Sequence, residues 1–155
     1  MSLQLLLLRH GHAQGGWDEA ALLPEGVQAV QRTLAAPALT QFGPVDLLLH
    51  SPLRRAVETA RLVAAHWPCE RVRVEPLLRP DTDASECARS VAGQLEGVGR
   101  AVLVAHLPLL PALARWWADA DVALAPAGAC LLEATTLWQG TATRVAEIGG
   151  DHDPH

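Results

Sequence analysis

Lysine, long apolar runs and a regular cysteine pattern are all missing from this sequence. All twelve basic residues are arginine, they form no basic stretch, and the net charge is −5. This balance argues against nucleic acid or an anionic membrane surface as a partner. The apolar run at residues 5–8 is far too short to cross a bilayer, and nothing around it resembles a signal peptide. We therefore expect a cytoplasmic protein that does not associate with membranes.

The three cysteines, Cys69, Cys87 and Cys130, are few and widely separated. Their number and spacing fit neither a disulfide framework nor a zinc site, so we expect buried thiols. The chain has 155 residues, half of them hydrophobic, which suits one domain with a sizeable core. We predict a single domain over residues 1–149 and a flexible tail over residues 150–155. His152 and His155 in that tail could hold a metal, but a solvated acidic tail is the favoured interpretation.

Short apolar runs alternate with helical patterns along the chain. We predict strands at residues 3–8, 45–49, 71–74 and 101–105, and a hairpin-like pair at 130–137 and 143–148. Helices are predicted to begin at Pro24, Ser51-Pro52, Asp83 and Pro108, because serine and aspartate cap helices and proline fits their first turn. Strands alternating with helices predict an α/β fold, a three-layer sandwich whose mostly parallel central sheet is flanked by helices.

Polar residues directly follow three of the predicted strands. Arg9-His10-Gly11 follows the first, residues 50–55 follow the second, and His106 follows the fourth. Ligands of open α/β sheets bind beyond the carboxyl ends of the strands, so these segments converge on one crevice if the strands are parallel neighbours. Arg54 and Arg55 lie in the first turn of a helix, where positive charge is unfavourable unless an anion binds there. We expect Arg55 to face the crevice and Arg54 to face solvent.

These segments resemble the motifs of the histidine phosphatase superfamily, which includes the cofactor-dependent phosphoglycerate mutases. Leu8-Arg9-His10-Gly11 resembles the first motif, residues 51–60 the second, and Val104-Ala105-His106 the third; residues 23–29 are similar to a weaker motif. The leucine-proline after His106 is most similar to the short SixA-type phosphohistidine phosphatases. The resemblance implies a phosphoglycerate mutase-like fold, and the short interval after residue 77 leaves no room for the helical cap domain of larger relatives.

The resemblance also implies a role for each motif residue. His10 is expected to accept the phosphoryl group as nucleophile, forming a phosphohistidine intermediate that water hydrolyses. The phosphate-binding residues are expected to be Arg9, Gly11, Arg55, His106 and Leu107. Only a neutral imidazole has a free lone pair for the attack, and nearby arginines disfavour the imidazolium. Because guanidinium groups can neutralise the phosphate oxygens, we expect neither a metal nor another cofactor.

The leaving group needs separate consideration. Members of the superfamily that hydrolyse phosphate esters usually carry a glutamate shortly after the third strand, and Pro80 occupies that place here. Asp81 is the candidate acid, since Asp83 is expected to cap a helix. An alkoxide leaves poorly without an acid, whereas solvent can protonate the imidazole of phosphohistidine. We therefore favour a phosphatase for a phosphohistidine protein; the alternatives are a phosphatase for a small phosphate ester and a non-catalytic phospho-ligand binding module.

Overall fold

The computed structural model describes residues 2–150, so the predicted tail and its two histidines lie outside the described residues, apart from Gly150. One six-stranded sheet has the order β3-β2-β4-β1-β5-β6. Its strands are β1 (Leu3–Arg9), β2 (Val45–His50), β3 (Cys69–Val74), β4 (Arg100–Ala105), β5 (Ala129–Ala134) and β6 (Thr143–Ile148). The first four are parallel to one another, whereas β5 is antiparallel to both β1 and β6. The prediction of a mostly parallel sheet is confirmed.

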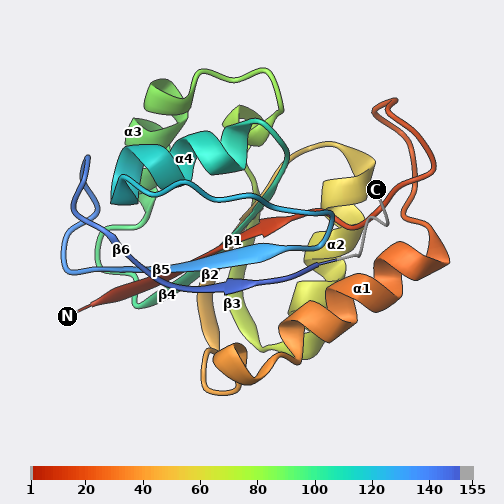
Figure 1. Ribbon diagram of the computed structural model, residues 1–155, viewed down its shortest axis with the longest axis horizontal. Helices are drawn as coiled ribbons and strands as arrows, with labels where there is room; N and C mark the ends of the chain where they lie inside the picture. Colours follow the sequence, from red (N-terminus) through yellow and green to blue (C-terminus); the bar gives the residue numbers. More distant parts are fainter. Residues whose placement is uncertain (1, 151–155) are drawn as a thin grey trace.

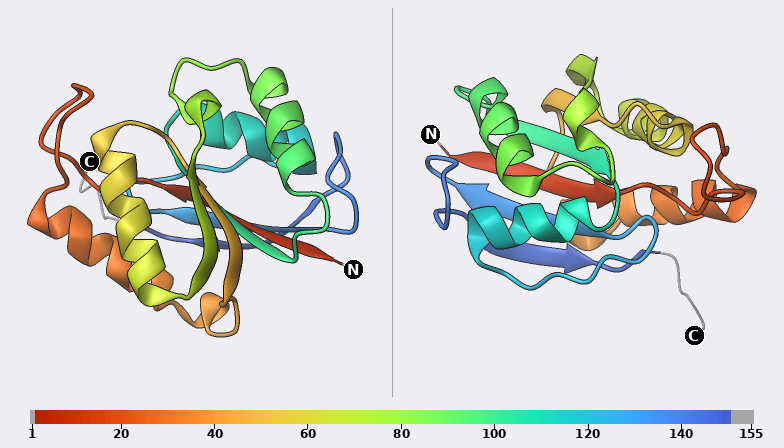
Figure 2. Two further views of the ribbon diagram at one scale, coloured as in Figure 1. Left: turned by 180° about the vertical axis from the view of Figure 1, so that it is seen from behind. Right: turned by 90° about the horizontal axis from the view of Figure 1, so that it is seen from above.

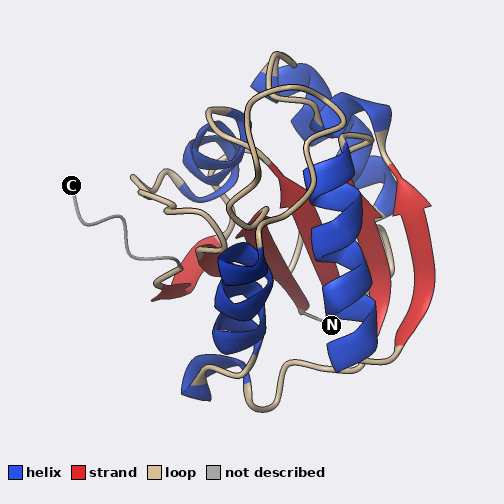
Figure 3. Cartoon of the chain, turned by 90° about the vertical axis from the view of Figure 1, so that its right-hand side faces the viewer, coloured by secondary structure: helices blue, strands red, loops and turns tan. Residues whose placement is uncertain are grey.

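Helices cover both faces of the sheet (Figure 1; Figure 3). The helices are α1 (Pro24–Leu34), α2 (Arg54–His66), α3 (Ala84–Gln94) and α4 (Leu109–Ala118). Helices α1 and α2 share one hydrophobic cluster with one face of the sheet, and α3 and α4 share the other cluster with the opposite face. The predicted three-layer sandwich is therefore confirmed. None of the helices within residues 2–150 has the length and apolar character needed to cross a membrane.

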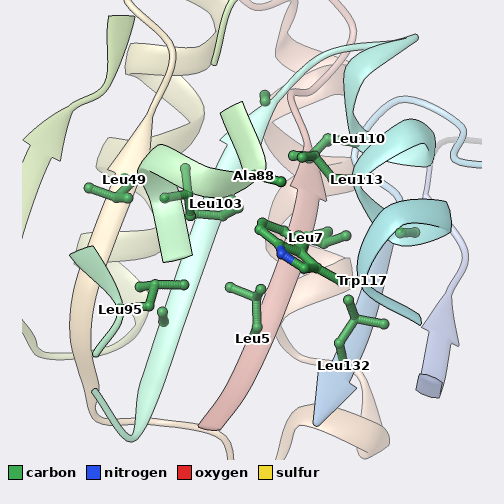
Figure 4. Close-up of a cluster of buried hydrophobic side chains, with 14 of the residues drawn as sticks. Leu5, Leu7, Leu49, Ala88, Leu95, Leu103, Leu110, Leu113, Trp117 and Leu132 are labelled. Atoms are coloured by element: carbon green, nitrogen blue, oxygen red, sulfur yellow. The ribbon is translucent and has the colours of Figure 1, made fainter. Parts of the chain in front are cut away.

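Strand β1 is buried on both faces, which explains its continuous apolar sequence. Leu5 and Leu7 face α3 and α4, with Trp117 of α4 close to them (Figure 4), while Leu6 and Leu8 face α1 and α2. All four leucines are at most 1% exposed. Burying each such side chain contributes roughly 1.5–3 kcal/mol, so the strand gives the residues that follow it a firmly anchored base.

Helix α2 begins later than the sequence predicts. The expected cap and first turn at Ser51-Pro52 are wrong: the helix starts at Arg54, with Leu53 as its N-cap residue and no side-chain cap. The Ser51 hydroxyl lies instead against His106, which the strand order brings beside it. By contrast, Asp83 caps α3 as predicted, since its carboxylate accepts a hydrogen bond from the Glu86 N–H at 3.1 Å.

The carboxyl ends of β2, β4 and β1 lie side by side. The β1–β4 pairing places Arg9 opposite Ala105, and the β2–β4 pairing places His50 opposite Val104. The three polar segments therefore leave the sheet at the same edge, and the arrowhead of β1 points toward the loop before α1 (Figure 2). Between β3 and α3, residues 75–83 carry one short 3₁₀ turn, Pro76–Leu78. No cap domain is therefore present in the described chain, as predicted.

Candidate active site

A cleft of about 720 Å³ opens at this edge of the sheet. Arg9, His10, Arg55, His106 and Leu107 all line it, so the structure brings residues of all three motifs together. The other lining residues are His12, Ala13, Gly15, Gly16, Leu23, Glu25, Pro80 and Pro126. Two residues predicted for the site, Gly11 and Asp81, are not among those that line the cleft.

His10 has the geometry of a neutral nucleophile. It is 9% exposed, and its Nδ1 lies 2.7 Å from the Gly11 carbonyl oxygen. A carbonyl only accepts hydrogen bonds, so Nδ1 carries the ring proton and Nε2 carries the lone pair. Arg55 Nε lies 3.4 Å from Nε2 and donates to it. Burial, with smaller contributions from Arg55 and Arg9, lowers the pKa of His10 to about 4, against the raising effect of the Gly11 carbonyl. The ring is therefore neutral near pH 7.

The backbone of Gly11 holds His10 in place and is itself held by Thr59. Its N–H donates to Thr59 Oγ1 at 3.1 Å, and the Thr59 hydroxyl donates to the Arg55 carbonyl at 2.8 Å. The phosphate-binding role expected of Gly11 stays a prediction, since in this structure its N–H donates to Thr59. A Cβ on Gly11 would lie 2.8 Å from the Gly26 carbonyl oxygen of α1. Glycine is required here because the backbones approach closely.

The two arginines of the cleft have no carboxylate partner within 4 Å among residues 2–150. Arg9 Nη1 donates to the Leu124 carbonyl at 2.8 Å, while its buried Nε has no hydrogen-bond partner. Arg55 Nη1 donates to the Trp17 carbonyl at 3.2 Å. Burial lowers the pKa of both guanidinium groups. Arg55 is buried and Arg9 is half-buried, and the carboxylate of Asp18 offsets only part of the effect of burial on Arg55. Two such cations without a carboxylate within 4 Å form an anion-binding site.

Arg54 differs from Arg55 as predicted. Its side chain is half exposed, and its Nε lies 3.0 Å from a Glu58 carboxylate oxygen on the same helix. The ion pair is therefore on the surface, where such pairs contribute little to stability. Of the two consecutive arginines, only Arg55 lines the cleft.

His106 completes the polar wall of the cleft. It is 2% exposed, and its ring centroid lies 5.0 Å from that of His10. Burial, followed by the neighbouring His10 and Arg55, lowers the pKa of His106 to about 3, so this ring is also neutral. Its Nδ1 is buried and has no hydrogen-bond partner. A buried polar atom left in this way costs about 1–3 kcal/mol, which a bound oxyanion would offset.

The acidic residues near the cleft lie differently from the prediction. Asp81 is exposed, and it is the preceding residue, Pro80, that lines the cleft. Among the described lining residues, Glu25 alone carries a carboxylate. Sequence reasoning missed Glu25 as a site residue, although it lies in the weaker motif at residues 23–29. Within residues 2–150, no three or more His, Cys, Asp or Glu side chains gather closely enough to hold a metal ion.

Comparisons with known proteins agree with this arrangement. The model of the histidine phosphatase superfamily (branch 1) matches residues 5–81. The structure of the protein histidine phosphatase SixA complexed with tungstate is similar, with a TM-score of 0.80 and 21% identity over 95% of this chain and 97% of that chain.

Enzymes for small substrates share the fold. A mycobacterial glucosyl-3-phosphoglycerate phosphatase has a TM-score of 0.74 and 16% identity over 98% of this chain and all of the other. A phosphoserine phosphatase mutant from Entamoeba histolytica, in complex with phosphoserine, has a TM-score of 0.70 and 14% identity over 94% and 96% of the two chains. No curated protein matches the chain in sequence. At these identities the structural likeness establishes the fold.

Proposed function

Since this chain belongs to the histidine phosphatase superfamily, we propose that it removes phosphate from phosphohistidine in a partner protein, without a metal, through a phospho-His10 intermediate. One observation carries the proposal: the neutral, buried His10 directs its Nε2 to Arg55 in a cleft where, among the described residues, neither arginine has a carboxylate within 4 Å and where Arg9 Nε and His106 Nδ1 have no hydrogen-bond partner. Such a cleft combines a nucleophile with preorganised stabilisation of phosphoryl oxygens.

The reaction has two steps. In the first, the His10 Nε2 lone pair forms a bond to phosphorus as the bond from phosphorus to the leaving nitrogen breaks. That nitrogen keeps the bonding electron pair, and solvent supplies the proton with which the imidazole leaves as a neutral molecule. In the second, a water oxygen attacks phosphorus, the electron pair of the P–N bond returns to Nε2, and the water proton passes to the phosphate. The Gly11 carbonyl, 2.7 Å from Nδ1, stabilises the positive ring while it is phosphorylated.

Two features of the cleft support phosphohistidine as the substrate. Residues 75–83 form a short connection without a cap domain, so a histidine projecting from another protein has access to His10. The position after β3 presents Pro80 to the cleft, and proline cannot donate a proton to a leaving group. An imidazole requires less acid assistance than an alkoxide, so this cleft favours P–N over P–O cleavage.

A small phosphate ester is the second candidate substrate. Glu25 lines the cleft with His10, and a carboxylic acid there could protonate a leaving alkoxide. The phosphoserine and glucosyl-3-phosphoglycerate phosphatases with the same fold are enzymes of that kind. Glu25 thus replaces Asp81 as the acid to test first.

A comparison of two substrates tests the choice between these candidates. We expect kcat/KM on a phosphohistidine peptide to exceed that on an unactivated alkyl phosphate by at least about two orders of magnitude, because the alkoxide lacks a well-placed acid. Glu25→Gln should leave the phosphohistidine reaction nearly unchanged, and Asp81→Asn serves as the matched control. Equal efficiency on both substrates, with loss of ester hydrolysis in Glu25→Gln, would favour the small-ester function.

The covalent step is tested by trapping the intermediate. We expect His10→Ala to lose turnover, because Nε2 is the atom that accepts phosphate, while the variant stays folded and still binds vanadate. Quenching the wild-type enzyme with labelled substrate in the presence of EDTA should trap acid-labile, alkali-stable phosphate on the protein. His10→Ala should trap none. Substantial turnover by the variant would exclude the covalent mechanism, and loss of wild-type labelling in EDTA that a divalent ion restores would exclude metal independence.

A further inference from the structure

Ser51 lies in a position that helix capping does not explain. It follows β2 directly, is completely buried, and donates its backbone N–H to the Val104 carbonyl of β4 at 3.0 Å. This bond fixes Ser51 beside the strand that ends just before His106. The Ser51 hydroxyl then lies 2.6 Å from His106 Nε2. Ser51 thus lies behind the wall of the cleft: it contacts His106, which lines the cleft, but does not line the cleft itself.

The direction of the hydrogen bond between Ser51 and His106 follows from counting protons. A hydroxyl has one proton and two lone pairs. The Leu53 N–H donates to Ser51 Oγ at 3.3 Å, which uses one lone pair. If His106 Nε2–H also donated to Oγ, the hydroxyl proton would have no acceptor among the described residues, and an unpaired buried donor costs about 1–3 kcal/mol. The favoured arrangement therefore has the hydroxyl donating to Nε2.

The hydrogen bond accepted at Nε2 determines which nitrogen of the His106 ring carries the proton. Because His106 is neutral and Nε2 accepts, its single ring proton must be on Nδ1. That nitrogen is the buried atom without a partner, on a ring whose centroid lies 5.0 Å from that of His10. In the opposite tautomer, a lone pair on Nδ1 would face the oxygens of the phosphoryl group and repel them.

We propose that Ser51 is a positioning residue that holds His106 in the Nδ1–H tautomer, so that Nδ1–H donates to the transferring phosphoryl group. The kinetic part of this inference rests on the proposed phosphatase function. The tautomer itself does not, because it can be observed in the resting protein.

The tautomer is tested by NMR of the full chain labelled with ¹⁵N-histidine, at neutral pH and without substrate. Comparison with the His106→Gln spectrum assigns the His106 ring signals. We expect Nδ1 of His106 to be protonated in the wild type, and protonation to shift toward Nε2 in Ser51→Ala. A wild-type ring protonated at Nε2 would overturn the proposal, whether or not the protein proves to be a phosphatase.

Kinetics test the consequence for the reaction. We expect Ser51→Ala to lower kcat about 10- to 100-fold, somewhat less than the loss of a whole oxyanion-hole donor. Ser51→Thr keeps the hydroxyl and should recover most of that loss. Ser90→Ala, a half-buried serine of α3 outside the cleft, is the matched control and should behave as wild type. A Ser51→Ala rate within twofold of wild type would overturn the proposal.

Testing Ser51→Ala in a protein that already carries His106→Asn separates control of the tautomer from general damage to the fold. The side-chain amide of His106→Asn has an NH₂ group near the position of Nδ1 and no tautomers. We therefore expect Ser51→Ala to have little further effect on kcat in His106→Asn. An equal loss in both backgrounds would mean that Ser51 acts only by holding the fold, and would overturn the positioning role.

Discussion

At the scale of single residues, the cleft is defined by polar atoms that have no partner. Arg9 Nε and His106 Nδ1 are both buried without a hydrogen-bond partner, and Arg55 is buried with no carboxylate within 4 Å among the described residues. Groups of this kind destabilise a protein that keeps the site empty. Their retention in one cleft indicates that the site is built around an anion.

Two adjacent arginines allow a matched test at this scale. We expect Arg55→Ala to lower kcat/KM by on the order of a hundredfold or more, because Arg55 contacts Nε2 of His10 and lines the cleft. Arg54→Ala removes an exposed ion pair with Glu58 and an exposed hydrogen bond to the Glu19 carbonyl, and should change the rate by less than about threefold. Steady-state kinetics of both variants on one substrate test this prediction. A larger loss of kcat/KM in Arg54→Ala than in Arg55→Ala would identify Arg54 as the phosphate-binding residue.

At the scale of elements, the site depends on contacts between segments that are distant in sequence. Thr59 of α2 connects the backbone of Gly11, after β1, to the backbone of Arg55. The same hydroxyl therefore positions both the peptide that orients His10 and the first turn of the helix that carries the arginine. We expect small displacements of α2 relative to β1 to affect chemistry before they affect folding.

This coupling predicts different effects for two substitutions at helices. Thr59→Val keeps the shape of the side chain but removes the hydroxyl. We expect it to cost about 1–3 kcal/mol of stability, because the Gly11 N–H is left unpaired, and to lower kcat at least tenfold. Asp83→Ala removes the cap of α3 and should lower the stability of the protein with kcat unchanged. Chemical denaturation and kinetics on both variants check this, and unchanged kcat in Thr59→Val would contradict the coupling.

How far the sequence predicts the site depends on the range of each interaction. The residues at the ends of β1 and β4 are predictable, because buried apolar runs mark where these strands stop. Ser51 is assigned wrongly as a helix cap, since its actual partner, His106, is 55 residues away and only the strand order reveals it. Glu25 is missed for the same reason, because the packing of α1 brings it to the cleft. Local patterns predict the elements, but the contacts between them require the fold.

At the scale of the whole molecule, the two neutral histidines couple stability to pH. The pKa values of His10 and His106 are lowered from 6.5 to about 4 and about 3, so both rings bind protons more readily in the unfolded chain. The free energy of unfolding should therefore fall as pH decreases from about 6.5 to about 3, with the contribution of His10 complete near pH 4. We expect a shallower fall in His10→Ala, measured by urea denaturation at several pH values. Equal slopes in both proteins would contradict the lowered pKa of His10.

The strand order also determines when the protein becomes active during its synthesis. The His10 N–H donates to the carbonyl of Ala105, and the His10 carbonyl accepts from the N–H of Ala127. The nucleophile emerges from the ribosome well before these backbone partners, which follow about a hundred residues later in the sequence. A nascent chain that lacks β4 and β5 cannot hold His10 in place, so catalytic competence appears only after both strands have been synthesised. Because these strand pairings join residues that are distant in sequence, they also slow folding.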